Sequence, residues 1–192
     1  MRRKLSFSMP VVVAVVGSAV AGAAFAQDGQ AQKVSWKAAG VSIHTQISLD
    51  RNWPPASMNH ARINGTFGLG MLHSMVEPAR VEVSQCPAET KYEYKILEAT
   101  NVVTLDSDLS QLIYQSKSGL CCITADGKIT ATMDLEVVGG TGRFKGATGT
   151  LKSIMTDEGG SVSFDEWKGE FNNMSSLTEG TIVLSAARGS KN

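Results

Sequence analysis

Apolar and polar residues alternate with a period of two over long stretches of the chain. The first stretch alternates the apolar residues Val41, Ile43, Ile47 and Leu49 with the polar residues Ser42, His44, Gln46 and Ser48. A second stretch carries the apolar residues Ile63, Phe67, Leu69 and Met71 at odd positions. A period of two is typical of strands with one buried face. We therefore expect Val41 and its apolar partners to face the core, and Ser42 and His44 to face outward.

The longest alternation begins directly after the turn signal Asp126-Gly127. There the apolar residues are Ile129, Ala131, Met133, Leu135 and Val137, and the arrangement predicts a hairpin followed by a long strand. Glycine-rich turn signals also divide the rest of the C-terminal half into strand-length segments. No stretch after the N-terminus combines helix caps with an apolar stripe, so the strands are expected to be antiparallel. About eight strands would fit, in a sandwich or a closed barrel.

The N-terminal segment 1–26 predicts a secretory signal peptide. Arg2, Arg3 and Lys4 precede an apolar run, and Ala24-Phe25-Ala26 provides the small residues that cleavage requires. We divide the chain into this signal peptide, an N-terminal extension with the first strand (27–59), a β-barrel domain (60–186) and a C-terminal tail (187–192). The Ala-rich signal indicates a bacterial protein exported to the periplasm or the medium.

Charge and hydropathy exclude several classes of partner. Removal of the segment 1–26 leaves 15 basic and 18 acidic residues, a formal net charge of −3. This balance does not favour nucleic acid or an anionic membrane surface. No later stretch approaches the roughly 20 apolar residues of a membrane-spanning helix.

Three cysteines remain after the signal segment, in a compartment where disulfides persist. Cys121 and Cys122 are adjacent, and one peptide unit holds neighbouring Cα atoms too close for ordinary disulfide geometry. The expected bridge joins Cys86 to Cys121 or to Cys122. The remaining thiol is expected to be a small buried side chain.

The segment EVVGGTGRFKGATGTL, residues 136–151, has the glycine content of a phosphate-binding loop. A phosphate loop opens a helix whose N-terminal amides face the anion, and the Thr-rich residues after Gly146 do not predict a helix. We interpret the segment as a tight corner in which Phe144 plugs one end of the sheet. Its glycines would supply positive φ angles; they are Gly139, Gly140, Gly142, Gly146 and Gly149.

The segment TATMDLEVVGGTGRFKGATGTL resembles the signature of the allene oxide cyclase-like barrel superfamily, which includes plant dirigent proteins. The shared features are a strand ending in Val137-Val138-Gly139-Gly140-Thr141-Gly142, followed by Phe144, Lys145, Ala147 and Gly149. The chain is most similar to the small exported bacterial members. The resemblance implies an all-β fold: a single antiparallel eight-stranded β-barrel with an apolar cavity, often assembled as a dimer or trimer. It implies no particular reaction, because the matched segment is architectural.

Three functions compete on these observations. The first is a barrel that binds a small hydrophobic or aromatic molecule without transforming it. The second is a cofactor-free isomerase, cyclase or lyase for a hydrophobic or phenolic substrate. The third is a structural or partner-binding barrel with a filled core.

The candidate catalytic residues are Tyr94, Glu98 and His73. Strand parity places Glu98 on the face of Tyr92, Tyr94 and Ile96, where burial would suit a carboxyl to proton transfer. His73 continues the face of Leu69 and Met71. No metal site is expected, because the three histidines show no short paired spacing, and no cofactor motif is present.

Overall fold

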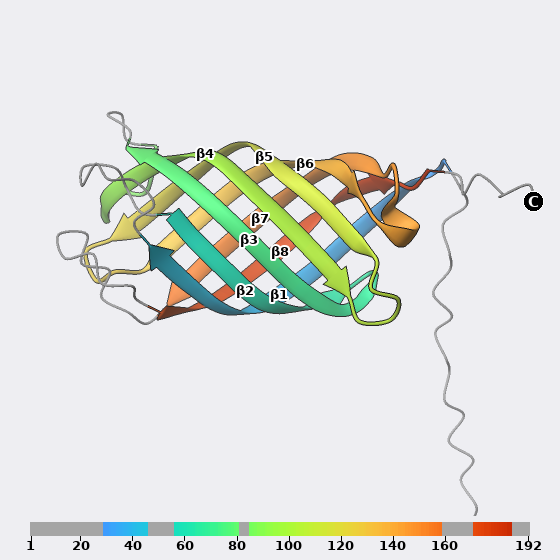
Figure 1. Ribbon diagram of the computed structural model, residues 1–192. Helices are drawn as coiled ribbons and strands as arrows, with labels where there is room; N and C mark the ends of the chain where they lie inside the picture. The colour runs from blue at the N-terminus through green and yellow to red at the C-terminus, as the bar shows by residue number, and fades with distance from the viewer. Residues whose placement is uncertain (1–28, 46–55, 81–84, 159–170, 186–192) are drawn as a thin grey trace, which may run out of the picture.

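The chain forms a closed eight-stranded β-barrel in the computed structural model, which describes residues 29–45, 56–80, 85–158 and 171–185. Figure 1 shows the tilted strands wrapping around one axis. In chain order the strands are β1 (Ala31–Thr45), β2 (Ala56–Gly65), β3 (Gly68–Arg80), β4 (Thr90–Leu105), β5 (Gln111–Thr124), β6 (Ile129–Gly140), β7 (Thr148–Glu158) and β8 (Phe171–Val183). The expected all-β, eight-stranded antiparallel barrel is confirmed. The predicted signal segment lies outside the described residues.

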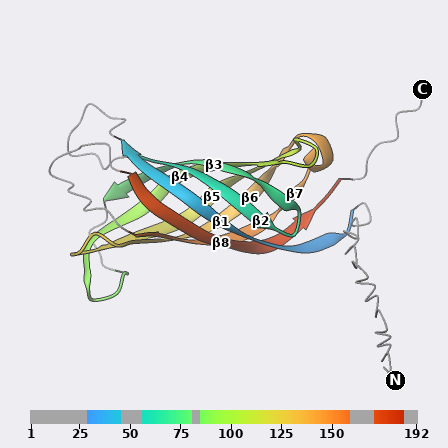
Figure 2. The same cartoon turned by 90° about the horizontal axis from the view of Figure 1, so that it is seen from below.

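Closure depends on the pairing of the first and last strands. Each strand pairs with its neighbour in sequence, and β1 also pairs antiparallel with β8, from Ala31 opposite Val183 to Ile43 opposite Phe171. Figure 2 shows β1 and β8 side by side along the barrel. Closure removes the free strand edges that an open sheet would expose.

The barrel has two unlike ends, which we call the plugged end and the far end. The plugged end holds the β2–β3 turn and the short helix η1 (Gly142–Phe144), and β1, β3, β5 and β7 finish at the far end. Near the plugged end, Trp36 and Tyr114 pack with ring centroids 5.8 Å apart. Phe144 is fully buried and meets Phe67 edge-on at 4.9 Å. The strand β6 alternates as expected, with Ile129, Ala131, Met133, Leu135 and Val137 all buried.

The glycine-rich segment forms the corner between β6 and β7. Gly142 has φ +55° and Gly149 has φ +154°, conformations that glycine adopts without a side-chain clash. A Cβ atom on Gly149 would also lie 2.2 Å from the carbonyl oxygen of Thr181. The chain therefore turns here at a point where β7 and β8 lie too close for any side chain.

Two of the expected strand faces are wrong. Ser42 is completely buried, whereas Val41 is exposed, so the interior face of β1 is the opposite of the one predicted. His44 lies where side-chain placement is not described. On β3, Leu69 is 54% exposed and points away from the core. The reason is that several apolar side chains lie on the outer wall of this barrel and several polar ones lie in its interior. The alternation therefore shows that a strand has two faces, but it does not show which face is inside.

The plug formed by Phe144 should be a large contributor to stability. We expect Phe144→Ala to lower the free energy of unfolding by about 3–5 kcal/mol, because it removes a fully buried ring and leaves a cavity. Val138→Thr, at a nearby exposed position on β6, should change it by less than about 0.5 kcal/mol. Urea unfolding of both variants measures the difference, and equal losses would show that Phe144 does not plug the barrel.

Candidate functional site

A set of polar side chains crosses the middle of the barrel interior. We call it the interior polar belt, and its members are Ser42, Asn59, Ser74, Asn101, Ser153 and Thr178. Five of them are buried and Ser74 is half-buried. They come from β1, β2, β3, β4, β7 and β8, so the belt reaches most of the way around the barrel wall.

Hydrogen bonds join the belt across neighbouring strands. The Ser42 hydroxyl donates to Oδ1 of Asn59, and Nδ2 of Asn59 donates to Oγ of Ser74 at 2.8 Å. Between β8 and β7, Oγ1 of Thr178 donates to Oγ of Ser153 at 3.0 Å. These contacts follow from register, since Ser42 pairs with Asn59 and Asn59 with Ser74.

The belt residue on β4, Asn101, is held loosely by the neighbouring strand β5. Nδ2 of Asn101 lies 3.5 Å from the carbonyl oxygen of Tyr114, a long separation for a hydrogen bond. All six members of the belt are neutral, so they offer hydroxyl and amide groups without a net charge. A group inside the barrel would meet both donors and acceptors.

A buried carboxyl lies closer to the far end. Asp157 on β7 is 1% exposed and pairs in register with Ile129. Its charge acts on Cys121, the free cysteine, which packs against both apolar clusters of the interior. Burial, and secondly the charge of Asp157, raise the pKa of the Cys121 thiol to about 12. Cys121 is therefore a protonated, weakly nucleophilic side chain at neutral pH.

The structure separates the three residues selected from the sequence as catalytic. Tyr94 is buried and packs with Ile123 and Ile129. Glu98 is exposed, because β4 contains an extra residue: Glu77 pairs with Glu98 and Pro78 with Ile96, which leaves Leu97 without a partner. This β-bulge reverses the parity of β4 after Ile96.

His73 is exposed on the outer wall and pairs with His60 of β2. It therefore shares no interior space with Tyr94. Sequence reasoning missed all of the interior polar belt, and it also missed Asp157. Asp157 had a usable signal, since it continues the period-two run of Leu151, Ser153 and Met155. Asn59 had a similar signal, since it continues the period-two run of Ala61 and Ile63 on β2; register decides only which side chains of the neighbouring strands it meets.

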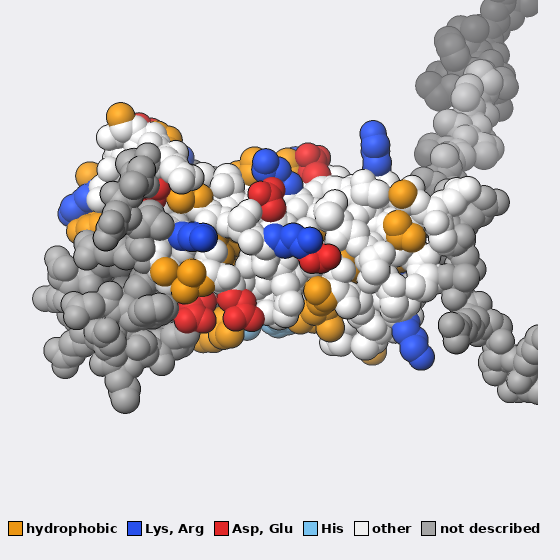
Figure 3. Space-filling view, turned by 90° about the horizontal axis from the view of Figure 1, so that it is seen from above, with side chains coloured by type: hydrophobic (Ala, Val, Ile, Leu, Met, Phe, Trp, Pro, Cys, Tyr) orange, Lys and Arg blue, Asp and Glu red, His pale blue; other side chains and the backbone are white. Residues whose placement is uncertain are grey.

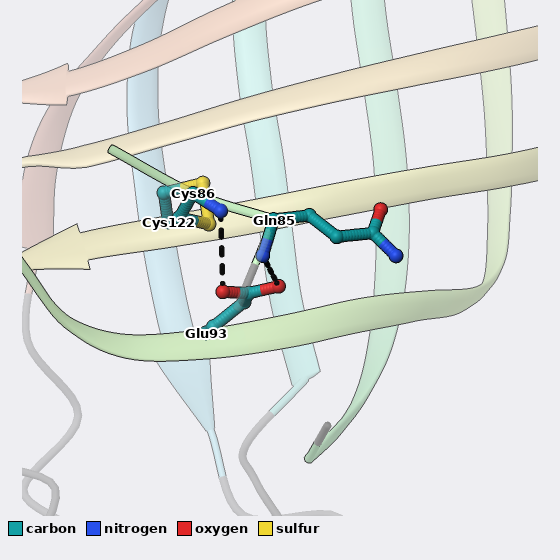
Figure 4. The surroundings of a disulfide bond; sticks show 4 residues. All are labelled: Gln85, Cys86, Glu93 and Cys122. Carbon is teal, nitrogen blue, oxygen red and sulfur yellow. Dashed lines mark hydrogen bonds between the residues drawn. A yellow bond between two sulfur atoms is a disulfide. The ribbon is translucent and has the colours of Figure 1, made fainter. Parts of the chain in front are cut away.

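The disulfide is formed by Cys86 and Cys122, with Cα atoms 5.8 Å apart. It anchors the segment before β4 to the outer side of β5, where the Glu93 carboxylate accepts hydrogen bonds from the backbone N–H groups of Gln85 at 2.7 Å and Cys86 at 3.2 Å. Figure 4 shows this arrangement. Of the two bridges that the sequence left open, the structure contains the one that leaves Cys121 inside.

A shallow groove of about 380 Å³ adjoins the anchored segment on the outer wall. Its lining includes Glu93, Lys95, Asp134 and Lys152, so its charges nearly cancel. Figure 3 shows the same mixture of positive and negative side chains on one face of the barrel. The groove therefore lacks the apolar lining that is typical of small-molecule sites.

Within the described ranges, no helix is long and apolar enough to cross a membrane. Comparison with known families finds no family model that matches the chain. No curated protein matches it either. Among solved structures, the chain is similar to a pterocarpan synthase dirigent protein, at 12% identity over 83% of this chain and 88% of that chain, with a TM-score of 0.28.

The protonated state of Cys121 can be tested by alkylation. With a pKa of about 12, the thiolate is a minute fraction at pH 8, so iodoacetamide should leave Cys121 unmodified in the folded protein. The same reagent should add one label after unfolding in guanidinium chloride without reductant, which keeps the Cys86–Cys122 bridge closed. Intact-mass measurement gives the result, and rapid labelling of the folded protein would contradict the raised pKa of the Cys121 thiol.

Proposed function

We propose that the mature protein is an exported binding protein that holds a small, mainly apolar or aromatic molecule inside the barrel. The observation that carries this proposal is the interior polar belt. A barrel selected only for stability gains most from apolar packing, since each buried polar group must recover its lost hydration through hydrogen bonds. Here six polar side chains from six strands occupy the interior. Their role in binding is to orient the polar group of a ligand.

The difference between the two ends of the barrel suggests which part of the interior binds the ligand. Trp36, Tyr114 and Phe144 pack the plugged end with aromatic rings. Toward the far end, the wall beside the belt has small residues, including Ala99 and Ala131, both buried. The ligand would therefore lie between the belt and the far end. A neutral belt suits a hydroxyl or carbonyl group on the ligand better than a charged group.

Export is part of the same proposal. The intramolecular disulfide between Cys86 and Cys122 fits an oxidising compartment, and the segment 1–26 has the pattern of a secretory signal. A bacterial periplasm or culture medium is the location that we infer from these two features. Assembly into a dimer or trimer stays a prediction.

Substitutions in the belt should remove the ligand while the barrel remains folded. We expect Asn59→Leu and Thr178→Val each to reduce binding at least about tenfold, because each removes hydrogen-bonding groups from the interior. The matched control is Asn64→Leu, which changes an exposed side chain on the same strand as Asn59. Native mass spectrometry of protein isolated from its own compartment identifies the ligand, and titration with that compound gives the affinities.

Equal affinity in Asn59→Leu and Asn64→Leu would remove the belt from binding. Protein that carries no small molecule, and binds none of a panel of phenolic and apolar compounds, would contradict the proposal. It would favour instead the third function, a filled barrel that acts through its surface.

A second function, a cofactor-free isomerase, cyclase or lyase, is favoured by the buried carboxyl of Asp157. Tyr94, Cys121 and Asp157 come from three strands at the far end of the interior. In this proposal Asp157 exchanges a proton with the substrate and Tyr94 orients it. Glu98 and His73 take no part, because their side chains are exposed on the outer wall.

Asp157→Asn tests the enzymatic proposal. It should reduce turnover of the isolated compound or its precursor by about 100-fold or more, while binding changes less than about threefold. Glu98→Gln, an exposed carboxyl on β4, is the control and should leave turnover unchanged. Product formation measured by liquid chromatography decides the matter; full activity in Asp157→Asn would exclude Asp157 as the acid or base.

A further inference from the structure

The outer wall brings together two histidines that lie 13 residues apart in the sequence. His60 and His73 are directly opposite each other on β2 and β3. Their Nδ1 atoms are 2.8 Å apart, and both side chains are exposed. The rings meet edge-on with centroids 5.0 Å apart. In this geometry one ring donates its Nδ1 proton to the other, so two ring nitrogens already converge on one point.

Methionines flank the histidine pair on the same face. Met58 and Met75 form the next outward-facing cross-strand pair, and they are 36% and 49% exposed. Side chains two residues apart on a strand are separated by about 6.6 Å along it, a gap that the long, flexible thioether side chain of methionine can span. Met71 lies at the corresponding distance on the other side of His73 and is half-buried.

The rest of this surface contains little that would attract a hard cation. On the outer face, the positions that surround the two histidines in register are Val41, Met58, Arg62, Met71, Met75 and Val102. None of these six is a carboxylate. The one charged member, Arg62, forms an ion pair with Asp106. Elsewhere in the described ranges, no three His, Cys, Asp and Glu side chains gather as a metal site.

We propose that His60, His73 and the thioethers of Met58 and Met75 form a surface binding site for a soft monovalent metal ion, namely Cu(I). Thioether ligands select soft ions, and imidazole also binds copper well. Zn²⁺ would prefer further nitrogen, thiolate or carboxylate ligands, and none of the six positions that surround the histidine pair provides one. The site lies on the outside of the barrel wall and is separate from the interior polar belt.

The geometry of the pair requires only a small adjustment to hold an ion. Two nitrogens at metal–nitrogen distances of about 2.0 Å in a tetrahedral arrangement lie about 3.3 Å apart. The Nδ1 atoms are 2.8 Å apart, so a modest side-chain rotation makes room. Both histidines sit on paired strands of the barrel, and therefore the backbone holds them together before the metal arrives.

The experiment is an anaerobic titration with Cu(I), using bicinchoninate as the competing chelator. Every protein carries Cys121→Ala, so that the free thiol does not bind copper. We expect one Cu(I) per chain, and at least about a 100-fold loss of affinity in His60→Gln/His73→Gln. Met58→Leu/Met75→Leu should lower the affinity for Cu(I) by about tenfold. Met155→Leu, at a buried methionine, is the thioether control and should leave the affinity unchanged.

Parallel titrations with Zn²⁺ and Ag(I) test the choice of ion. The affinities of the variants for Ag(I) should fall in the same order as their affinities for Cu(I). Zn²⁺ should bind the unsubstituted site more weakly than Cu(I). Circular dichroism should show the same folded spectrum for all variants, because the changed ligands are on the outer wall. Absence of stoichiometric Cu(I) binding, or equal binding by the double histidine variant, would overturn the site. Tighter binding of Zn²⁺, unaffected by the methionine substitutions, would overturn the soft-ion assignment.

Discussion

The pairing of β1 with β8 is the contact on which the rest of the molecule depends. It closes the sheet along Ala31 to Ile43 of β1 and so creates an inside and an outside. Once the sheet is closed, alternate residues of every strand must face either a confined interior or the outer wall. The buried belt and the exposed histidine pair are two consequences of that division. The two features share β2 and β3, where Asn59 and Ser74 of the belt face in and His60 and His73 face out.

The interior is graded along its axis. The plugged end is packed with aromatic and aliphatic side chains around Phe144. The polar belt follows, and beyond it lie Asp157 and Cys121. The composition of the interior can vary along the axis because the backbone N–H and C=O groups of the closed barrel form hydrogen bonds between strands and do not depend on the side chains. We therefore relate the stability of the barrel to the packing at the plugged end, and the proposed ligand binding to the side chains between the belt and the far end.

The sequence predicts the fold well because period-two alternation and turn glycines are local signals. The strand Ile129–Gly140 and its preceding Asp126-Gly127 turn can be predicted from their own residues, although the folded strand is paired with β5 and β7. The residues of the candidate site are harder to predict from the sequence, for two physical reasons. An extra residue at Leu97 reverses the parity that had placed Glu98 inside. The pairing of His60 with His73 and of Ser42 with Asn59 depends on register between strands, which single-strand patterns do not contain.

The central claim is that the belt is a ligand-facing surface inside a closed barrel. A high-resolution crystal structure of the mature protein, isolated without refolding from its own compartment, tests it most directly. The account predicts density for a small organic molecule on the far side of the belt, in hydrogen-bond contact with Asn59, Asn101 or Thr178. An interior in which these side chains bond only to one another, and apolar side chains fill the remaining space, would contradict it.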